Sequence, residues 1–267
     1  ASALPEETAA TARKRQALRY GENPHQRGGW YVPTEGSSWG LGTLRQLQGK
    51  ELSYNNLLDL DAALRCLLEF TDPTCVIVKH TMPCGVASAS PATLAYDRAY
   101  ACDPESAFGG IVGINQPVDQ GLAEHLVSTF LEVILAPSVE PAAAGILAKK
   151  PNLRVVTVTW PASRPAELQW RHLLGGWLLQ DPDLQIETAA AMKLATKRAP
   201  TESEQADLGF AWKAAKHAAS NSVVLVRDRA TVGIGQGQPS RVAAVRLALQ
   251  HAGERAKESV AASDGFF

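Results

Sequence analysis

A lysine and a histidine stand side by side at positions 79 and 80, directly after the apolar run 75–78. A histidine titrates near neutral pH, so His80 can carry a proton during a reaction. The ammonium group of Lys79 can stabilise negative charge that develops in a transition state. Taken alone, the pair fits a strand end that reaches solvent better than a catalytic site. Burying both charges would cost free energy unless they have partners, which makes the pair a candidate for chemistry.

Two further segments have residue types that suit an anionic ligand. Segment 19–26 (RYGENPHQ) has almost no apolar content and contains Arg19 and Tyr20. The planar fork of donors on arginine suits phosphate, although a surface turn is the simpler explanation of the composition alone. Segment 233–241 (GIGQGQPSR) places free amides and Arg241 at the start of a predicted helix, a natural anion site. It matches neither the G-x-G-x-x-G pattern nor the P-loop.

Two shorter motifs are weaker signals. The glycines of segment 107–110 (AFGG) let backbone amides approach a ligand, or simply form a turn. Asn221, within Ser220-Asn221-Ser222, stands at a predicted change from helix to strand, where an ordinary cap is the simpler interpretation.

The elements that position these residues alternate between helical and short apolar segments, as in an α/β protein. The patterns predict helices over 56–70, 90–101, 119–130, 138–149, 201–219 and 241–252, and strands over 75–78, 111–114, 133–136, 153–158, 222–226 and 231–234. Lys79 and His80 then follow a buried strand at its C-terminal edge, where open α/β sheets usually bind ligands. Residues 160–170 contain prolines and two tryptophans and predict a boundary between two halves of similar element order.

Composition excludes several classes of protein. The 267 residues carry 26 basic and 27 acidic side chains, a balance that indicates no nucleic-acid partner. No apolar run approaches the roughly 18 residues that a membrane span needs. The four cysteines form no C-x-x-C pair and fit reduced thiols in a cytoplasmic protein.

A zinc site of the deaminase type needs H-x-E in one segment and P-C-x-x-C in another. Pro83-Cys84 lacks the second cysteine, and H-x-E does not occur in the sequence. We therefore expect no zinc. A zinc hydrolase on the same fold remains the first alternative, and stoichiometric zinc in the purified protein would establish it.

Taken together and in this order, nine segments resemble one family closely, the aminoimidazole carboxamide ribotide (AICAR) transformylase domain of bifunctional purine-biosynthesis enzymes. The resemblance spans essentially the whole chain and lies in RYGENPHQ (19–26), GKELSYNNLLDLDAA (49–63), VKHTMPCGVA (78–87), DPESAFGGIV (103–112), EVILAP (132–137), TKRAPT (196–201), SNSVVLV (220–226), VGIGQGQPSR (232–241) and ASDGFF (262–267).

The resemblance implies two cytidine-deaminase-like α/β subdomains, residues 1–164 and 165–267, each three-layered with a mixed sheet and without zinc. It implies transfer of a formyl group from 10-formyltetrahydrofolate to the 5-amino group of AICAR, which yields FAICAR and tetrahydrofolate. Family members form homodimers with sites at the subunit interface, and neither a membrane nor nucleic acid is an expected partner.

The resemblance also implies roles for individual residues. Lys79, His80 and Asn221 are expected at the reacting amine, with His80 as general base and acid, Lys79 as electrostatic stabiliser and Asn221 as positioning donor. The expected ribotide contacts are Arg19, Tyr20, Gly109, Glu132, Arg241 and Phe266. Phe108, counted with the substrate contacts, is expected near the folate, as are Ser240 and Val242. Asp264 is placed with the cofactor contacts, and a monovalent cation can bind near it and Ser222.

The sequence departs from the family pattern in two ways. Met82 stands where the family has asparagine in K-H-x-N-P. The cyclohydrolase domain that precedes this one in the family, and a segment that follows the final Phe-Phe, are not in the sequence, so we expect both ends to be cut. An inactive ligand-binding fragment or paralogue is therefore the second alternative, and an assay of the full-length protein would discriminate.

Overall fold

The alternation of helical and apolar segments produces an α/β fold. The computed structural model describes residues 4–161, 163–185 and 192–265. Its elements in chain order are β1 (Ala12–Leu18), β2 (Gly28–Pro33), β3 (Gly40–Gln48), α1 (Tyr54–Leu67), β4 (Thr74–Lys79), β5 (Met82–Ser88), α2 (Ala92–Tyr100), α3 (Pro104–Ala107), β6 (Ile111–Ile114), α4 (Gln120–Ser128), β7 (Val133–Ala136), α5 (Pro141–Leu147), β8 (Arg154–Thr159), β9 (Gln169–Leu173), β10 (Gly176–Gln180), α6 (Glu202–Lys216), β11 (Val223–Arg227), β12 (Ala230–Gly235), α7 (Arg241–Ala252), the 3₁₀ helix η2 (Gly253–Ala256) and β13 (Val260–Ser263).

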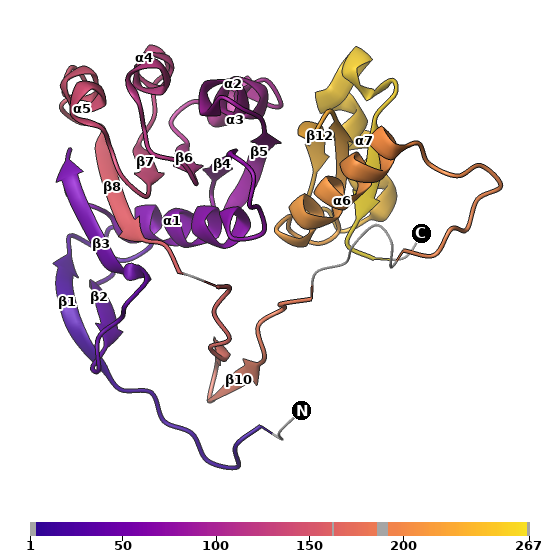
Figure 1. Cartoon of the computed structure of the whole chain (residues 1–267). Helices are drawn as coiled ribbons and strands as arrows, with labels where there is room; N and C mark the ends of the chain where they lie inside the picture. Colours follow the sequence, from indigo (N-terminus) through magenta and orange to yellow (C-terminus); the bar gives the residue numbers. More distant parts are fainter. Residues whose placement is uncertain (1–3, 162, 186–191, 266–267) are drawn as a thin grey trace.

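A nine-stranded mixed sheet forms the middle layer, in the order β13-β11-β12-β5-β4-β6-β7-β8-β3. The pairs β6–β7 and β7–β8 are parallel, and the other neighbours are antiparallel. Core clusters show that α1 and α6 cover one face, while α2, α4, α5 and α7 cover the other (Figure 1). The hairpins β1–β2 and β9–β10 form separate two-stranded sheets. The predicted α/β class with a mixed sheet is confirmed, but the strands of the two halves form one sheet, and those of the second half are all antiparallel.

The second half repeats the element order of the first half. Ser53 caps α1 and Thr201 caps α6, 148 positions later, and both helices begin with a capping box. Each helix leads into a two-stranded hairpin, β4–β5 or β11–β12, then into α2 or α7, and then into a strand that pairs beside the first hairpin strand. The similar element order predicted for the two halves is therefore visible in the structure.

The sheets of the two halves are joined into one. The strands β5 and β12 share one register pair, Ala87 with Ala230. Beside it, the Thr231 hydroxyl accepts from the Val86 amide at 2.9 Å and lies 3.2 Å from the Val86 carbonyl. One core cluster includes side chains of both α1 and α6. The division at residues 164 and 165 lies within the segment between β8 and β9, and it stays a prediction.

Most predicted helices and strands are present, with shifted ends. The helix predicted over 56–70 begins two residues earlier, because Ser53 accepts from the Asn56 amide. The sequence patterns missed β1, β2, β3, β5, β9, β10 and β13. Pro83 and Gly85 hid β5, since both residues normally interrupt strands.

The contact between β5 and α2 requires glycine at position 85. A β-carbon there would lie 1.9 Å from the Ala99 carbonyl oxygen. We expect Gly85→Ala to lower the free energy of unfolding by about 1–3 kcal/mol, because the backbone must move. Urea denaturation measures this. Gly145→Ala in α5, where a β-carbon meets nothing within 4 Å, is the control and should be neutral or stabilising. Equal midpoints for the two variants would contradict the expectation.

A buried carboxylate ties the segment after β8 to both halves. Glu69 follows α1, and its side chain is 4% exposed. It accepts from Arg164 Nη2 at 2.7 Å and lies 3.1 Å from Lys216 Nζ and 3.2 Å from His217 Nε2, both from the end of α6. Burial alone would raise the pKa of Glu69, but His217 and Lys216 outweigh it and lower that pKa.

The lowered pKa of Glu69 predicts acid sensitivity. A carboxyl whose folded pKa lies below its unfolded value contributes stability above the unfolded pKa, about 4.3 for glutamate, and loses it as pH falls further. At pH 7 we expect Glu69→Gln to cost about 1.5–3 kcal/mol, the worth of hydrogen bonds to a charged group. As pH falls from the unfolded pKa through the lower folded pKa, the difference between the wild type and the variant should shrink.

Urea unfolding between pH 7 and pH 3 checks this expectation. Asp61→Asn removes an exposed i,i+4 pair with Arg65 and serves as control, with an expected effect below about 1 kcal/mol. A Glu69→Gln cost that does not change with pH would refute the electrostatic explanation.

Candidate active site

The Lys79-His80 pair lies at a tight hairpin turn. Lys79 ends β4 and pairs with Met82, which begins β5, so His80 and Thr81 are the two turn residues. Their φ angles are +54° and +64°, the positive values that a type I′ turn requires. Non-glycine residues in this region cost about 1–3 kcal/mol each unless their surroundings hold them there. His80 is exposed at the tip of the turn, whereas Lys79 is half-buried.

The loop after α3 holds the Lys79 ammonium group. Lys79 Nζ donates to the carbonyl oxygens of Phe108 and Gly109, each at 3.0 Å. Gly109 has a φ of +68°, and a β-carbon there would lie 3.2 Å from Lys79 Nζ. The site therefore uses glycine at this position for both conformation and space.

An acidic group and an aromatic pair flank this loop. Glu132 Oε2 accepts from Asn56 Nδ2 at 3.0 Å and lies 3.7 Å from Arg154 Nη1. The rings of Phe108 and Phe130 are 5.1 Å apart between centroids, and the two residues are 60% and 56% exposed. The Glu132 carboxylate and the exposed rings of Phe108 and Phe130 thus flank the loop that holds Lys79.

A buried aspartate lies beneath the turn. Asp59, on α1, accepts from the Thr81 amide at 2.6 Å. Burial is the largest influence on its pKa and raises it, while the Thr81 amide and His80 act in the opposite direction. The hairpin tip therefore rests on a carboxylate from the helix layer.

The second half meets the first beside Met82. Since β5 and β12 are antiparallel, the start of β5 and the end of β12 lie at the same edge of the sheet. Gln236 Nε2 donates to the Pro83 carbonyl at 2.8 Å, and Met82 Sδ lies 3.8 Å from where a β-carbon on Gly237 would be. The Met82 sulfur therefore lies close to the glycine-rich loop of the second half.

Asn221 belongs to this loop region. Its side-chain Nδ2 and its backbone amide both donate to the Gln238 carbonyl, at 2.9 and 3.1 Å. Among the described residues, no hydrogen bond joins Asn221 to Lys79 or His80. The structure brings the three residues to one edge of the sheet without a hydrogen bond between Asn221 and the pair among the described residues.

Arg241 and Asp264 form an ion pair beside Ser222. Asp264 Oδ1 also accepts from the Ser222 amide at 2.6 Å and from its hydroxyl at 3.1 Å. Burial alone would raise the pKa of Asp264, but hydrogen bonds from Ser220, Ser222 and Arg241 hold it far below its usual range. The Arg241 Nε atom is buried and has no hydrogen-bond partner among the described residues.

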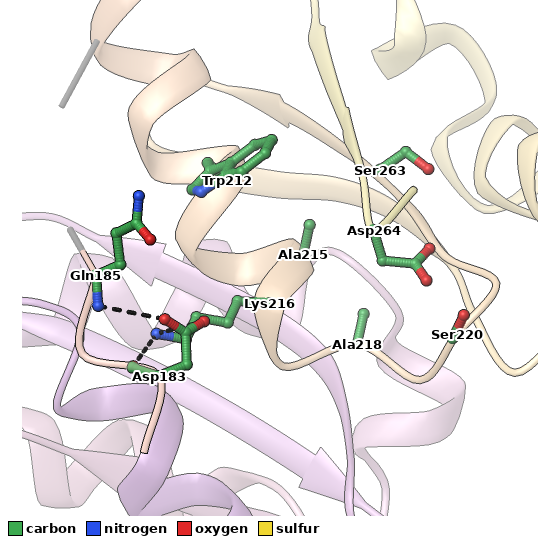
Figure 2. A pocket seen from close by; sticks show the side chains of 9 residues that line it. All are labelled: Asp183, Gln185, Trp212, Ala215, Lys216, Ala218, Ser220, Ser263 and Asp264. Atoms are coloured by element: carbon green, nitrogen blue, oxygen red, sulfur yellow. Dashed lines mark hydrogen bonds and ion pairs between the residues drawn. The ribbon is translucent and has the colours of Figure 1, made fainter. Parts of the chain in front are cut away.

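A pocket opens next to Asp264, between the chain end and α6. Figure 2 shows Ser220, Ser263 and Asp264 on one side and Trp212 and Lys216 of α6 on the other. Its volume is about 430 Å³. Lys79 and His80 are not among its lining residues, so it is distinct from the turn.

Among the described residues, the remaining predicted site residues form no hydrogen bond or ion pair with the Lys79-His80 turn. Arg19 and Tyr20 lie between β1 and β2, with the guanidinium 5.8 Å from the tyrosine ring centroid. Within the described ranges, no hydrogen bond or ion pair links them to Lys79 or His80. Ser240 is the N-cap of α7 and Val242 is 56% exposed, while Phe266 lies outside the described residues.

Comparison with known proteins identifies the family. Residues 1–251 match the AICARFT/IMPCHase bienzyme family. The chain belongs to this family. The chain is similar to proteins named bifunctional purine biosynthesis protein PurH. The one from Nostoc punctiforme is 50% identical over 254 residues, covering 94% of this chain and 49% of the relative. That from Bacillus subtilis is 45% identical over 266 residues, covering 98% and 51%.

The PurH protein of a Cyanothece species is 48% identical over 266 residues, covering 99% of this chain and 51% of the relative. The chain thus spans about half the length of these AICARFT/IMPCHase relatives.

Across residues 4–161, 163–185 and 192–265, no three His, Cys, Asp or Glu side chains are grouped to hold a metal ion, and the absence of zinc stays a prediction. In the same ranges no helix is long and apolar enough to cross a membrane.

Sequence reasoning missed several members of the site. Asn56, Asp59, Phe130 and Arg154 were not selected as site residues. For Asn56 and Asp59 a signal existed, because both fall on the otherwise apolar stripe of α1. A polar residue at a core position needs a partner, and here the partners are Glu132 and the Thr81 amide.

Proposed function

We propose that the protein transfers a formyl group from 10-formyltetrahydrofolate to the 5-amino group of AICAR, in the cytoplasm, as a step of purine synthesis. The observation that carries the proposal is the family match over residues 1–251, within which Lys79 and His80 lie at a hairpin turn on the sheet edge.

The reaction needs a base and an electrostatic stabiliser. The 5-amino group is a weak nucleophile, because its lone pair is drawn into the imidazole ring. As its nitrogen bonds to the formyl carbon, His80 accepts the amine proton and the carbonyl oxygen becomes an oxyanion. The oxyanion then collapses, the bond to the folate N10 breaks, and His80 returns the proton to that nitrogen.

Lys79 is oriented for the stabilising role. An ammonium group has three donors, and the carbonyls of Phe108 and Gly109 take two. Among the described residues no acceptor takes the third, which can donate to the developing oxyanion or to the ribotide. Asn221, on the facing loop, completes the set as a positioning donor.

The remaining predicted contacts divide by chemistry. Exposed Phe108 and Val242 offer apolar surface to a folate ring, and Ser240 opens α7 beside it. Arg241 and Arg19 suit the ribotide phosphate, with Tyr20, Gly109, Glu132 and Phe266 as further ribotide contacts.

A monovalent cation near Ser222 and Asp264 fits these residues poorly. Asp264 Oδ1 is already engaged by the Arg241 guanidinium and by two donors of Ser222. A second cation there would meet the charge of Arg241, so we assign it no step.

We also propose that residues 1–164 and 165–267 are two cytidine-deaminase-like subdomains. The repeat of helix, hairpin, helix and strand at a spacing of 148 residues, from Ser53 and from Thr201, supports this proposal.

A homodimer with sites at the subunit interface is part of the proposal. The hairpin β9–β10 exposes Leu173, Leu174, Trp177 and Leu178, which are 41% to 103% exposed. Exposed apolar groups of this size are typical of interfaces. Sedimentation of the full-length protein should show a dimer, and Trp177→Asp should shift it towards monomer.

An assay of the full-length protein tests the function. AICAR and 10-formyltetrahydrofolate should yield FAICAR and tetrahydrofolate, followed by their absorbance. Binding of both compounds without turnover would favour a ligand-binding paralogue. Stoichiometric zinc in the purified protein would favour the hydrolase alternative.

A further inference from the structure

Asp59 is a charged residue at a core position. It lies on the inner stripe of α1 with Leu60 and Ala63, and it is 9% exposed, whereas those two neighbours are fully buried. Aspartate is rarely buried unless it is paired or hydrogen-bonded. The helix therefore places a carboxylate where an apolar side chain would pack more simply.

The hydrogen-bond partner of Asp59 is an amide of the turn between β4 and β5. The Thr81 amide donates to Oδ1 at 2.6 Å, and the neighbouring His80 amide lies near enough to this carboxylate to help lower its pKa. These are the two residues with positive φ between β4 and β5. The carboxylate thus holds the Thr81 amide by a charge-assisted hydrogen bond and places its negative charge beside the His80 amide, in the orientation that the turn requires.

The same arrangement recurs 148 residues later. Asp207 on α6 is 5% exposed and accepts from the Asp228 amide at 2.9 Å and the Arg229 amide at 2.7 Å. Asp228 and Arg229 both have a φ of +54° and connect β11 to β12. A buried helix aspartate beneath a hairpin turn is therefore a feature of both repeats, but only the turn of the first repeat carries the Lys-His pair.

We propose that Asp59 is the positioning residue for His80. By holding two non-glycine residues at positive φ, it directs the imidazole at the edge of the sheet where Lys79 and the glycine-rich loop meet. The inference rests on the proposed function for its catalytic consequence, whereas its conformational consequence is independent of any substrate.

The repeat supplies a matched pair of variants. Asp59→Asn and Asp207→Asn each replace two acceptor oxygens by one and remove the charge, so both should lower the melting temperature of the full-length protein by similar amounts. Asp59→Asn should also lower kcat for formyl transfer by about 10²-fold with little change in KM, since misplacing a reacting group has effects of that size. Asp207→Asn should keep its kcat.

Crystal structures of the two variants give the substrate-independent readout. In Asp59→Asn, residues 80 and 81 should leave positive φ, and in Asp207→Asn, residues 228 and 229 should do so. A turn in Asp59→Asn that is unchanged would overturn the proposal. So would a relaxed turn combined with a kcat equal to that of Asp207→Asn.

A rescue variant separates positioning from mere stability and remains usable if Asp59→Asn does not fold. Glycine adopts positive φ without strain. Asp59→Asn with Thr81→Gly should therefore regain the turn and most of the lost kcat. A recovered turn without recovered kcat would contradict a positioning role. Absence of turnover in the wild type would count against the proposed function, while the crystal structures would still decide the inference about the turn.

Discussion

Replacing His80 by asparagine is expected to lower kcat for formyl transfer by about 10²–10⁴-fold, the usual contribution of a general acid–base group. Asparagine is chosen because it tolerates the φ of +54° at this position and cannot act as a general base. The hairpin should therefore persist while proton transfer is lost. Steady-state assays of the full-length protein, with circular dichroism to verify folding, measure the effect.

The repeat again provides the control. Asp228 occupies the equivalent turn position between β11 and β12, so Asp228→Asn makes the matching change away from the proposed site. Its kcat should equal that of the wild type. A folded His80→Asn variant with near-normal turnover would remove His80 from the mechanism.

Replacing Lys79 by methionine is expected to lower kcat by about 10²–10³-fold, the typical cost of losing one donor to a developing oxyanion. Methionine keeps the length of the side chain but cannot donate to the carbonyls of Phe108 and Gly109. The loop that carries these carbonyls should also be displaced, which should in addition raise the KM for AICAR.

Arg227, which ends β11 as Lys79 ends β4, is the matching position for a control. Its Nη1 donates to the Lys257 carbonyl at 3.1 Å, away from the sheet edge of the site. Arg227→Met should leave kcat unchanged. A rise in KM for the Lys79→Met variant without a fall in kcat would assign Lys79 to binding alone.

The sequence predicted the elements whose signals are local. Apolar runs flanked by breakers located β4, β6, β7 and β8, and the capping box at Thr201 located α6. The Lys79-His80 pair was found because it follows such a run directly. What these segments share is that neighbours in the chain determine their structure.

Elements that depend on distant partners escaped the prediction. β3 has a polar, glycine-containing sequence and pairs with β8, more than 100 residues away. β13 is a strand because β11 lies beside it. For such edge strands the propensity of the sequence is weak, and pairing in the folded chain decides the conformation.

The sequence by itself determined the α/β class, the family resemblance and the identity of the Lys-His pair, because residue types and short periodic patterns carry that information. The tertiary structure alone decided how the pair is held. Asp59 comes from a helix in another layer, and Gly237 of the second half reaches Met82 because β5 and β12 are antiparallel. In both cases the residues are at least 22 positions apart in the chain. Only the packing of the folded chain brings them together, so the sequence pattern could not predict it.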